Sequence, residues 1–207
     1  MSKVFPHNAG KDNIFKSCDA SLSRMGTDYL DLYLLHWRGS VPLRETVACM
    51  EELVARGKIR HWGVSNFDLD DMRELWSIPK GDACVTNQVL YHLGSRGVEF
   101  DLLPWMQQRD VPLMAYCPLA QAGALRRGLL GSAAVRVAAE RHNAAPEQIL
   151  LAFLLTKPGV LPIPRTGQAE HARVNAEAVG LRLSAEDLEE LDRAFPAPTS
   201  RVPLDIQ

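Results

Sequence analysis

The sequence predicts an α/β protein of the (β/α)8 TIM-barrel type, with about six of the eight strand–helix units present. Short apolar runs alternate with longer amphipathic segments, which indicates a parallel sheet covered by helices. No glycine-rich phosphate fingerprint opens any of these helices, so a doubly wound dinucleotide fold lacks its main signal. Polar residues also end several successive strands, where the active sites of barrels are built.

The first half of the chain gives three strand–helix pairs. Leu30–Trp37 is a near-continuous apolar run, as in a parallel strand buried on both faces. The helix after it places Val47 and Met50 on one face, and Gly57 ends it. Asp68 has the residue type of a helix N-cap. The expected pairs are Ser2–Phe5 with Ile14–Met25, Leu30–Trp37 with Leu43–Arg56, and Ile59–Val64 with Asp68–Trp76.

The second half continues the alternation with three more strands and five helices. Pro146 suits the first position of a helix, and Ser184 with Asp187 has the pattern of a capping box. The Gly- and Ala-rich segment Pro118–Gly131 is expected to be a loop, and the tail from Pro196 irregular. The strands are Cys84–Tyr91, Val111–Cys117 and Val160–Pro164. The helices are Asp101–Arg109, Ser132–His142, Pro146–Thr156, Gln168–Val179 and Ser184–Phe195.

Length and composition favour one domain, residues 1–207, with an ordinary globular core. The chain is 46% hydrophobic and its net charge is −2, so nothing indicates a nucleic acid or membrane partner. No apolar signal segment begins the chain, and we expect a cytoplasmic protein. Six units are two short of a complete barrel. We therefore expect the chain to be N-terminally truncated, with the first two strands and an N-terminal hairpin missing before Met1.

The four cysteines lie more than thirty residues apart in sequence, at positions that match no metal-ligand or disulfide spacing. We expect four reduced thiols and no metal site.

Several polar residues at strand ends are candidates for a site, each with a structural alternative. His36 ends an apolar strand, where a neutral imidazole can polarise a substrate carbonyl, although a lone histidine is more often structural. Ser65 and Asn66 suit recognition of a carboxamide, or simply a turn or helix cap. Asn87 and Gln88 present two amides in a buried strand, where a cofactor or the backbone can pair them.

The later strands end in an aromatic and a basic residue. Tyr116 is either a core aromatic or a flat surface for a nicotinamide ring. Arg165 and Thr166 precede a helix, and a guanidinium at a helix N-terminus suits a phosphate; the alternative is a surface arginine. Arg126 and Arg127, in the predicted loop, can fold over a pyrophosphate or remain an exposed basic pair.

Five motifs in this order resemble those of the aldo-keto reductases, in a bacterial-type member. They are YLDLYLLHW, GKIRHWGVSNF, TNQVLYH, AYCPLAQ and IPRT, and the resemblance runs from Lys3 to about Phe195. It implies an NAD(P)H-dependent oxidoreductase that reduces aldehydes and ketones to alcohols, with NADPH as cofactor and NADH possible.

The resemblance also implies roles for individual residues. Of the family's catalytic Asp, Tyr, Lys and His, Lys3 matches the lysine and His36 the histidine. Trp37 is implied as a substrate contact, although a packing role is as good an interpretation. The implied cofactor contacts are Ser65, Asn66, Gln88, Tyr116, Pro118, Leu119, Arg165, Thr166 and Asn175.

Two departures from the family pattern limit what the resemblance implies. The catalytic Tyr and Asp come from the region before Lys3, and Tyr33 lies three residues before His36, on the opposite face of a strand. His171 stands where the family often has arginine, and the family often has an acidic residue near Val174; both departures weaken the preference for NADPH over NADH. We expect impaired activity; the alternative is a non-catalytic nucleotide-binding or interaction fragment, with self-association possible through exposed strand edges. The sequence identifies neither the carbonyl substrate nor the oligomeric state.

Overall fold

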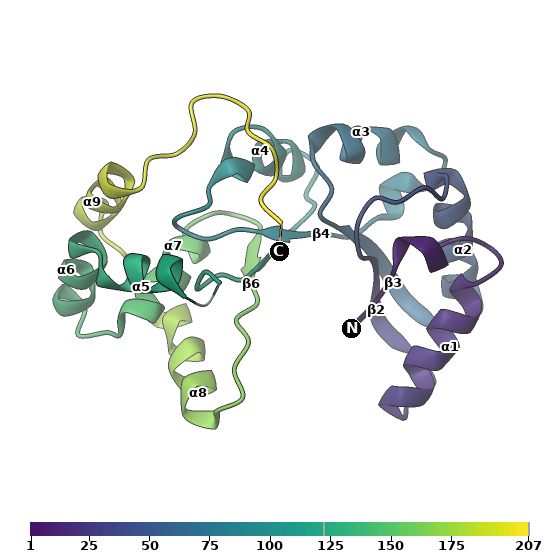
Figure 1. The fold of residues 1–207 in the computed structure, drawn as a ribbon, viewed down its shortest axis with the longest axis horizontal. Coiled ribbons are helices and arrows are strands. Elements are labelled where there is room, and N and C mark those ends of the chain that lie inside the picture. The colour runs from purple at the N-terminus through teal and green to yellow at the C-terminus, as the bar shows by residue number, and fades with distance from the viewer. Residues whose placement is uncertain (122, 207) are drawn as a thin grey trace. The chain divides into compact units, whose positions relative to one another are not determined.

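The computed structural model describes residues 1–121 and 123–206, and these form two compact units, Met1–Gln88 and the chain from Val89 onward. A six-stranded sheet runs in sequence order from β1 to β6, and the boundary between the units falls within β4 (Figure 1). The neighbouring pairs β1–β2, β2–β3, β3–β4 and β5–β6 are parallel. The strands are β1 Ser2–Val4, β2 Leu30–Leu35, β3 Ile59–Ser65, β4 Asn87–Leu90, β5 Leu113–Tyr116 and β6 Val160–Pro162.

Unit 1 packs its strands against helices whose ends follow from local chemistry. Its helices are α1 Ile14–Met25, α2 Leu43–Ala55 and α3 Leu69–Ser77. Gly26 ends α1 in the left-handed conformation at φ 63°, and Asp68 begins α3 with a capping box. In the sheet, Leu34 of β2 lies beside Gly63 of β3. A Cβ at Gly63 would lie 2.5 Å from the carbonyl oxygen of Thr86, so the close approach of backbone there requires glycine.

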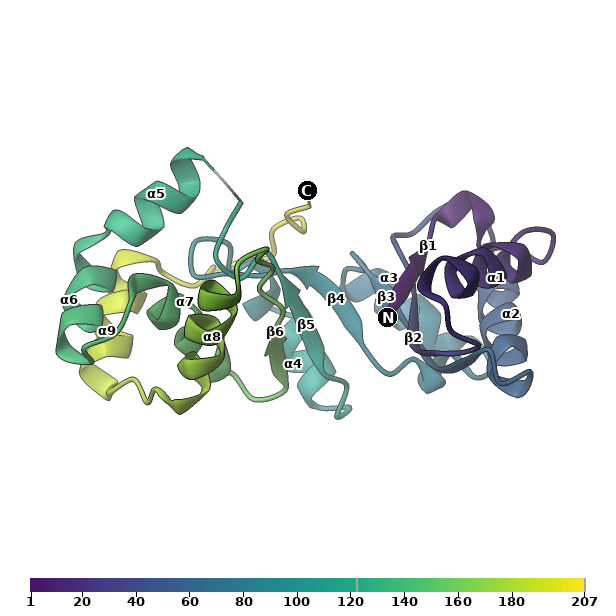
Figure 2. The ribbon, with the colours of Figure 1, turned by 90° about the horizontal axis from the view of Figure 1, so that it is seen from below.

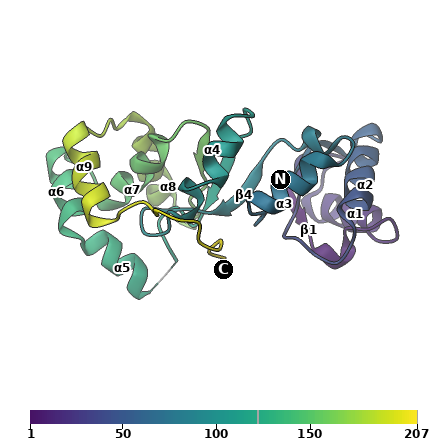
Figure 3. The same ribbon diagram turned by 90° about the horizontal axis from the view of Figure 1, so that it is seen from above.

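Unit 2 contains one helix that is buried over most of its length and one that is largely uncovered. Every residue of α7 from Gln148 to Leu154 is buried, whereas none of the residues of α8 is. Figures 2 and 3 show α9 lying along α6. The helices of unit 2 are α4 Leu102–Gln107, α5 Ala124–Gly131, α6 Ala133–Arg141, α7 Pro146–Leu155, α8 Ala169–Glu177 and α9 Ala185–Ala194.

A buried carboxylate joins α9 to the end of α6. Asp187 is fully buried, accepts a hydrogen bond of 2.6 Å from Arg141 and lies 2.7 Å from the Nε2 atom of His142. Burial alone raises the pKa of Asp187, but the hydrogen bonds from His142, Ser184 and Arg141 outweigh it and bring the pKa well below its usual value. The ionised carboxylate therefore stabilises this helix pair.

A second ion cluster joins α9 to the segment after β4. Arg96 is 7% exposed, and its guanidinium forms hydrogen bonds of 2.7 to 2.8 Å to Glu99 and of 2.7 Å to Asp192. The hydroxyl of Tyr91 donates a 2.7 Å hydrogen bond to the same Glu99 carboxylate. A buried charge needs such partners, and Asp192 supplies one of them from α9.

Most predicted elements are confirmed to within two or three residues at their ends. The helix Ile14–Met25, the Pro146 start and the Ser184 capping box are as expected, and the tail described up to residue 206 is irregular. The predicted strand Cys84–Tyr91 is shorter in the structure: β4 runs from Asn87 to Leu90, and a 3-10 turn at Gly81–Ala83 comes before it.

Two predictions about elements are wrong in ways that affect the site. Pro118–Gly131 is not all loop, because α5 occupies its second half: the good helix formers around Arg126 and Arg127 outweigh the glycines. The strand predicted to run through Trp37 ends at Leu35, so His36 follows the strand instead of belonging to it.

Cys18, Cys49 and Cys84 are buried, Cys117 is half-buried, and none of the four is part of a disulfide in the structure. Within the described part of the chain, none of the helices has the length and apolar character that a bilayer span needs. The assignment of residues 1–207 to a single domain stays a prediction.

Candidate functional site

In unit 1, three of the predicted site residues come together at the carboxyl edge of the sheet. The Nζ atom of Lys3, on β1, lies 3.4 Å from the hydroxyl oxygen of Ser65 at the end of β3. That hydroxyl donates a 2.8 Å hydrogen bond to the backbone carbonyl oxygen of Gln88 on β4. Ser65 is fully buried and Gln88 is 3% exposed, so the strands themselves hold this polar row in place.

Burial also sets the electrostatics of this row. Removal from water lowers the pKa of Lys3, because the charged ammonium loses hydration there. A lysine of this kind exchanges its proton more readily than an exposed one and places a positive charge beside the Ser65 hydroxyl.

His36 and Asn66 form a second contact in unit 1. The side-chain amide of Asn66 donates a 3.2 Å hydrogen bond to the carbonyl oxygen of His36, and Asn66 adopts a left-handed φ of 58°, a conformation that asparagine tolerates well. Burial, and then the charge of Lys3, lower the pKa of His36. The imidazole is therefore neutral near pH 7 and can donate a hydrogen bond without carrying charge.

Aromatic rings surround the imidazole of His36. Trp37 lies 4.7 Å and Phe5 5.5 Å from it, centroid to centroid, and Phe5 and Trp37 lie 5.5 Å apart in an edge-on arrangement. Trp37 is 41% exposed and Phe5 is 49% exposed. Exposed aromatic faces beside a neutral histidine form an apolar surface on which a small carbonyl compound can rest.

Asn87 has a structural position. Asn87 is fully buried, and its side-chain amide donates a 2.8 Å hydrogen bond to the backbone carbonyl oxygen of Phe67. Its side-chain oxygen accepts a 3.4 Å hydrogen bond from the backbone amide of Phe67. Of the two alternatives for Asn87, a cofactor or the backbone as its partner, the structure has the backbone. Asn87 thereby fixes the loop after β3 next to Asn66.

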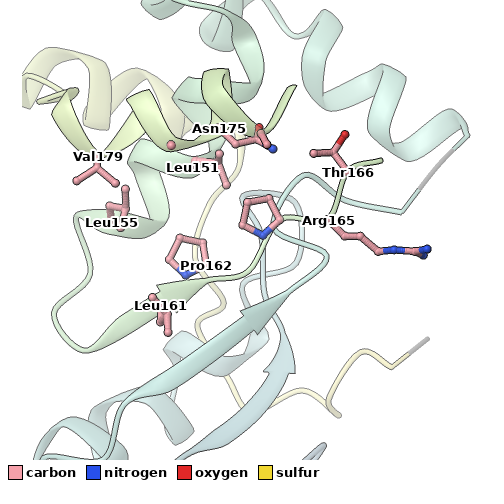
Figure 4. Close-up of a pocket in the computed structure, with 11 residues that line it drawn as sticks. Leu151, Leu155, Leu161, Pro162, Arg165, Thr166, Asn175 and Val179 are labelled. Carbon is pink, nitrogen blue, oxygen red and sulfur yellow. The ribbon is translucent and has the colours of Figure 1, made fainter. Parts of the chain in front are cut away.

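In unit 2, four predicted cofactor residues line one pocket of about 310 Å³. Leu119 follows β5, Arg165 and Thr166 follow β6, and Asn175 is on α8. Figure 4 draws an adjoining apolar groove that shares Arg165, Thr166 and Asn175 with this pocket, and it shows the side chain of Arg165 extended away from that groove. The full lining is Leu119, Arg126, Ala145, Glu147, Arg165, Thr166, His171, Val174 and Asn175.

The pocket in unit 2 has the chemistry of an anion site. Arg126 and Arg165 contribute two guanidinium groups, and the Oγ1 atom of Thr166 accepts a 3.1 Å hydrogen bond from the amide of Gln168 at the start of α8. Glu147 pairs with Arg126 across 3.7 Å. Two guanidiniums beside a helix N-terminus favour a phosphate group.

The remaining predicted residues of unit 2 lie outside that lining. Tyr116 ends β5 half-buried, and its carbonyl oxygen accepts a 3.4 Å hydrogen bond from the amide of Tyr91. Pro118 is buried, between Cys117 and Leu119. The left-handed φ of 50° at Cys117 and 60° at Ala120 turns the chain sharply after β5, and this turn places Leu119 in the pocket.

Phe5 and Glu147 were not identified from the sequence. Phe5 lies in a short segment without a motif, and Glu147 is in the first turn of α7, where an acidic residue is expected for helix stability alone. Neither position carries a local signal that would have found it. In the described residues, no group of three or more His, Cys, Asp or Glu side chains is placed to hold a metal ion.

Comparison with known proteins gives a single family. The sequence profile of the aldo/keto reductase family matches residues 2–195. Methylglyoxal reductase YeaE of Escherichia coli K12 is 55% identical over 206 residues, which are 100% of this chain and 72% of the relative. Glyoxal reductase of Bacillus subtilis is 33% identical over 92% of this chain and 66% of its own.

Solved structures give the same result. An aldo/keto reductase from Klebsiella pneumoniae in complex with NADP and acetate has a TM-score of 0.97 and 52% identity, covering 100% of this chain and 74% of the other. An aldo-keto reductase from the same organism in complex with NADPH has a TM-score of 0.96 and 54% identity, covering 99% and 72%.

Proposed function

The chain belongs to the aldo/keto reductase family, and on that premise we propose that it uses NADPH to reduce the carbonyl group of small aldehydes or ketones. The observation that carries the proposal is the row formed by Lys3, Ser65 and Gln88. The neutral His36 directly follows β2, the strand between β1 and β3. A row of fixed polar groups at the carboxyl edge of a parallel sheet is the position at which barrel enzymes bind and convert their substrates.

The hydrogen-bonding and charged groups of the two units suit NADPH. Bound NADPH supplies the hydride that reduces the carbonyl carbon. In unit 1, we propose that Ser65, Asn66 and Gln88 hold the nicotinamide carboxamide, because a hydroxyl and two amides match its donor and acceptor pattern. In unit 2, Arg165 and Thr166 suit the extra phosphate that distinguishes NADPH from NADH.

The other proposed cofactor contacts follow from position. Tyr116, at the end of β5, offers a ring for stacking, and Asn175, on α8, offers an amide for the adenine base. Leu119 lines the same pocket, and Pro118 sets the turn before it. NADH remains the alternative cofactor, because His171 contributes less fixed charge than an arginine would.

We propose a 2-oxoaldehyde as the substrate class. The relatives from Escherichia coli and Bacillus subtilis are named for methylglyoxal and glyoxal reduction. The rings of Phe5 and Trp37 beside His36 give a small apolar surface for such a substrate. A neutral His36 donates its N–H to the carbonyl oxygen, and so stabilises the negative charge that develops on that oxygen.

Lys3 and His36 are the two members of the catalytic tetrad that we assign to this chain. The tetrad's tyrosine is the general acid, and Tyr33 is a poor replacement for it: the side chain is fully buried and burial raises its pKa above the usual value. Loss of a general acid typically costs about 10²- to 10⁴-fold in rate. We therefore propose that the 207-residue chain binds NADPH and turns over slowly.

The same family membership supports two further proposals. Residues 1–207 act as one cytoplasmic domain, and the six strands correspond to six of the eight in a complete barrel, since the solved relative matches this chain over 74% of its own length.

Stopped-flow measurement of NADPH absorbance with methylglyoxal in single-turnover conditions tests the proposal. We expect a slow, NADPH-specific decay that His36→Ala reduces about 10²-fold or more. The matched control is His61→Ala, since His61 is an exposed histidine on β3 and is expected to leave the rate unchanged.

Binding, followed separately by NADPH fluorescence, distinguishes the outcomes. Binding without turnover supports the alternative of a non-catalytic nucleotide-binding module. Rates equal to those of the 55% identical relative contradict the proposed impairment, and absence of NADPH binding contradicts the function itself.

A further inference from the structure

The segments that follow β1 and β2 pack against each other in unit 1, and Pro6 and Gly39 make the contact. Pro6 is buried and begins a short 3-10 turn, Pro6–Asn8. Gly39 lies in the segment that joins β2 to α2. A Cβ at Gly39 would overlap the Cβ of Pro6 and would lie 3.4 Å from its Cα. The two segments can therefore pack this closely only because position 39 has no side chain.

Position 39 requires glycine for space and not for backbone conformation. The φ angle of Gly39 is not in the positive range that favours glycine, in contrast to Gly26 and Gly57. The opposing atom cannot move away by itself, because the proline ring fixes the Cβ of Pro6 to the backbone. A methyl group at position 39 therefore displaces the backbone of Pro6, whereas the end of a flexible side chain would simply turn aside.

Pro6 stands between two rings that belong to the aromatic group around His36. Phe5 and His7 stack nearly parallel, with their ring centroids 5.7 Å apart and an angle of 11° between the ring planes. Phe5 in turn stacks on His36 and meets Trp37 edge-on, with centroid distances of 5.5 Å in both cases. A displacement of Pro6 therefore moves the rings of Phe5 and His7 together.

The strand ends beside this contact are held together, so the rings have to take up the displacement. Val4 of β1 pairs with Leu35 of β2, and the Val4 carbonyl oxygen accepts a 3.0 Å hydrogen bond from the backbone amide of His36. His36 therefore keeps its place when the two segments are pushed apart, while Phe5, which follows Val4, does not. The gap between the Phe5 ring and the rings of His36 and Trp37 widens.

We propose that Gly39 is a positioning residue of the carbonyl site: by leaving room for Pro6, it keeps Phe5 against His36 and Trp37 and so restricts the site to small carbonyl compounds. This role rests on the proposed function, because the compound received beside His36 is the substrate of that reaction. Gly39 itself touches no substrate and acts through Pro6 and Phe5. With a methyl group at position 39, the site admits a bulkier carbonyl compound and binds a small one less tightly, because the small one loses its contact with a ring.

Exchange of the Cβ atom between the two positions tests this role. Gly39→Ala adds a Cβ, Pro6→Gly removes the opposing one, and the double variant again has a single Cβ at the contact. The ring-current shifts of the His36 and Phe5 C–H signals in NMR spectra report the stacking of the two rings. We expect these shifts to change in Gly39→Ala and to return toward their original values in the double variant. Pro6→Ala is the matched control: it removes the ring but keeps the Cβ, so it is expected not to rescue Gly39→Ala.

Binding of carbonyl compounds to the chain with NADP⁺ measures the selectivity without turnover. Hydroxyacetone is the small probe and acetophenone the bulky one, and each is titrated while the His36 C–H signals are followed. In Gly39→Ala we expect the ratio of the two dissociation constants to shift about fivefold in favour of acetophenone, which is the effect of one lost aromatic contact on the small probe. The double variant is expected to restore the original ratio.

The outcomes separate this role from the proposed function. An unchanged ratio in Gly39→Ala, or a changed ratio that the double variant does not restore, would overturn the role of Gly39 alone. Absence of probe binding to the unaltered chain would contradict the proposed function, and the role of Gly39 with it. Urea unfolding of each variant detects a loss of the fold. A Gly39→Ala chain that does not fold, and that Pro6→Gly does not rescue, would show that Gly39 serves stability only and would overturn the proposal.

Discussion

Ser65 in unit 1 is fully buried between Lys3 and Gln88, whereas Arg165 in unit 2 extends from an exposed loop at the mouth of a pocket. The first group is part of the sheet, and its side chains bond to neighbouring strands before any ligand arrives. The second group stands at the end of β6 and the start of α8, where backbone and side chains face the pocket. The polar groups of unit 1 are thus preorganised by folding, whereas those of unit 2 face the pocket and are available to a bound ligand.

This contrast has an experimental consequence. Substitutions among the strand-held groups of unit 1 are expected to change stability and ligand binding together, while those around the pocket of unit 2 are expected to change binding alone.

The largest loss of stability is expected from Asn87→Ala, because Asn87 fixes the loop after β3 beside the unit 1 site. It removes both hydrogen bonds to Phe67 and leaves a buried N–H and C=O without partners, which costs about 3 kcal/mol. Urea unfolding followed by tryptophan fluorescence measures it. Asn13→Ala is the control in the same unit, because Asn13 is exposed at the start of α1 and its side chain makes no capping hydrogen bond; an equal loss there would contradict the special role of Asn87.

A smaller loss of stability, about 2 kcal/mol at pH 7, is expected from Asp187→Asn. The reason is that the rigid part of unit 2 is its helix pair α6 and α9 and not its pocket. The pKa of Asp187 lies below its usual value in the folded state, so its stabilisation is present above the ordinary carboxyl pKa near 4 and is lost as pH falls toward the folded value. Unfolding curves at pH 7, 4 and 3 should show the difference between the two proteins beginning to narrow below pH 4. A change in NADPH affinity at pH 7 would argue against the separation of helix pair and pocket.

Arg165→Ala is expected to weaken NADPH binding about tenfold, which corresponds to about 1.4 kcal/mol, and to leave NADH binding and the unfolding midpoint almost unchanged. The reason is that an exposed guanidinium stabilises a bound phosphate and contributes little to packing. Fluorescence titration with both nucleotides checks this, with Arg136→Ala as the control, because Arg136 is an exposed arginine on α6 outside the pocket. Equal losses of affinity for NADPH and NADH would show that Arg165 does not bind the extra phosphate of NADPH.

The smallest effect concerns His36 and pH. Burial and the charge of Lys3 lower its pKa in the folded state, so the unfolded chain takes up this proton first as pH falls through the ordinary histidine range near 6.5. Stability should therefore fall slightly from pH 7.5 to pH 5, and His36→Gln should flatten that slope. His61→Gln, an exposed histidine, is expected to retain it. A slope unchanged in His36→Gln would show that the imidazole is not held neutral by its surroundings.

Much of the fold and part of the site are predictable from the sequence. The bounds of α1, the Pro146 start of α7 and the Ser184 capping box depend on residues within one or two turns, so local chemistry determines them. The apolar runs that become β2 and β3 are also local signals, as is the order of motifs that identifies the family. In that sense the sequence by itself determines the fold class and the residues Lys3, His36 and Arg165 as candidates.

Only the tertiary structure decides which of these residues meet and which surfaces stay uncovered. Lys3 and Ser65 are 62 positions apart, and Arg126 and Glu147 belong to different helices, so their contacts depend on strand register and helix packing instead of on any local pattern. The exposure of Leu161 and Val179 likewise follows from what does not pack against β6 and α8, and a hydrophobic residue has the same sequence signal whether or not it is covered.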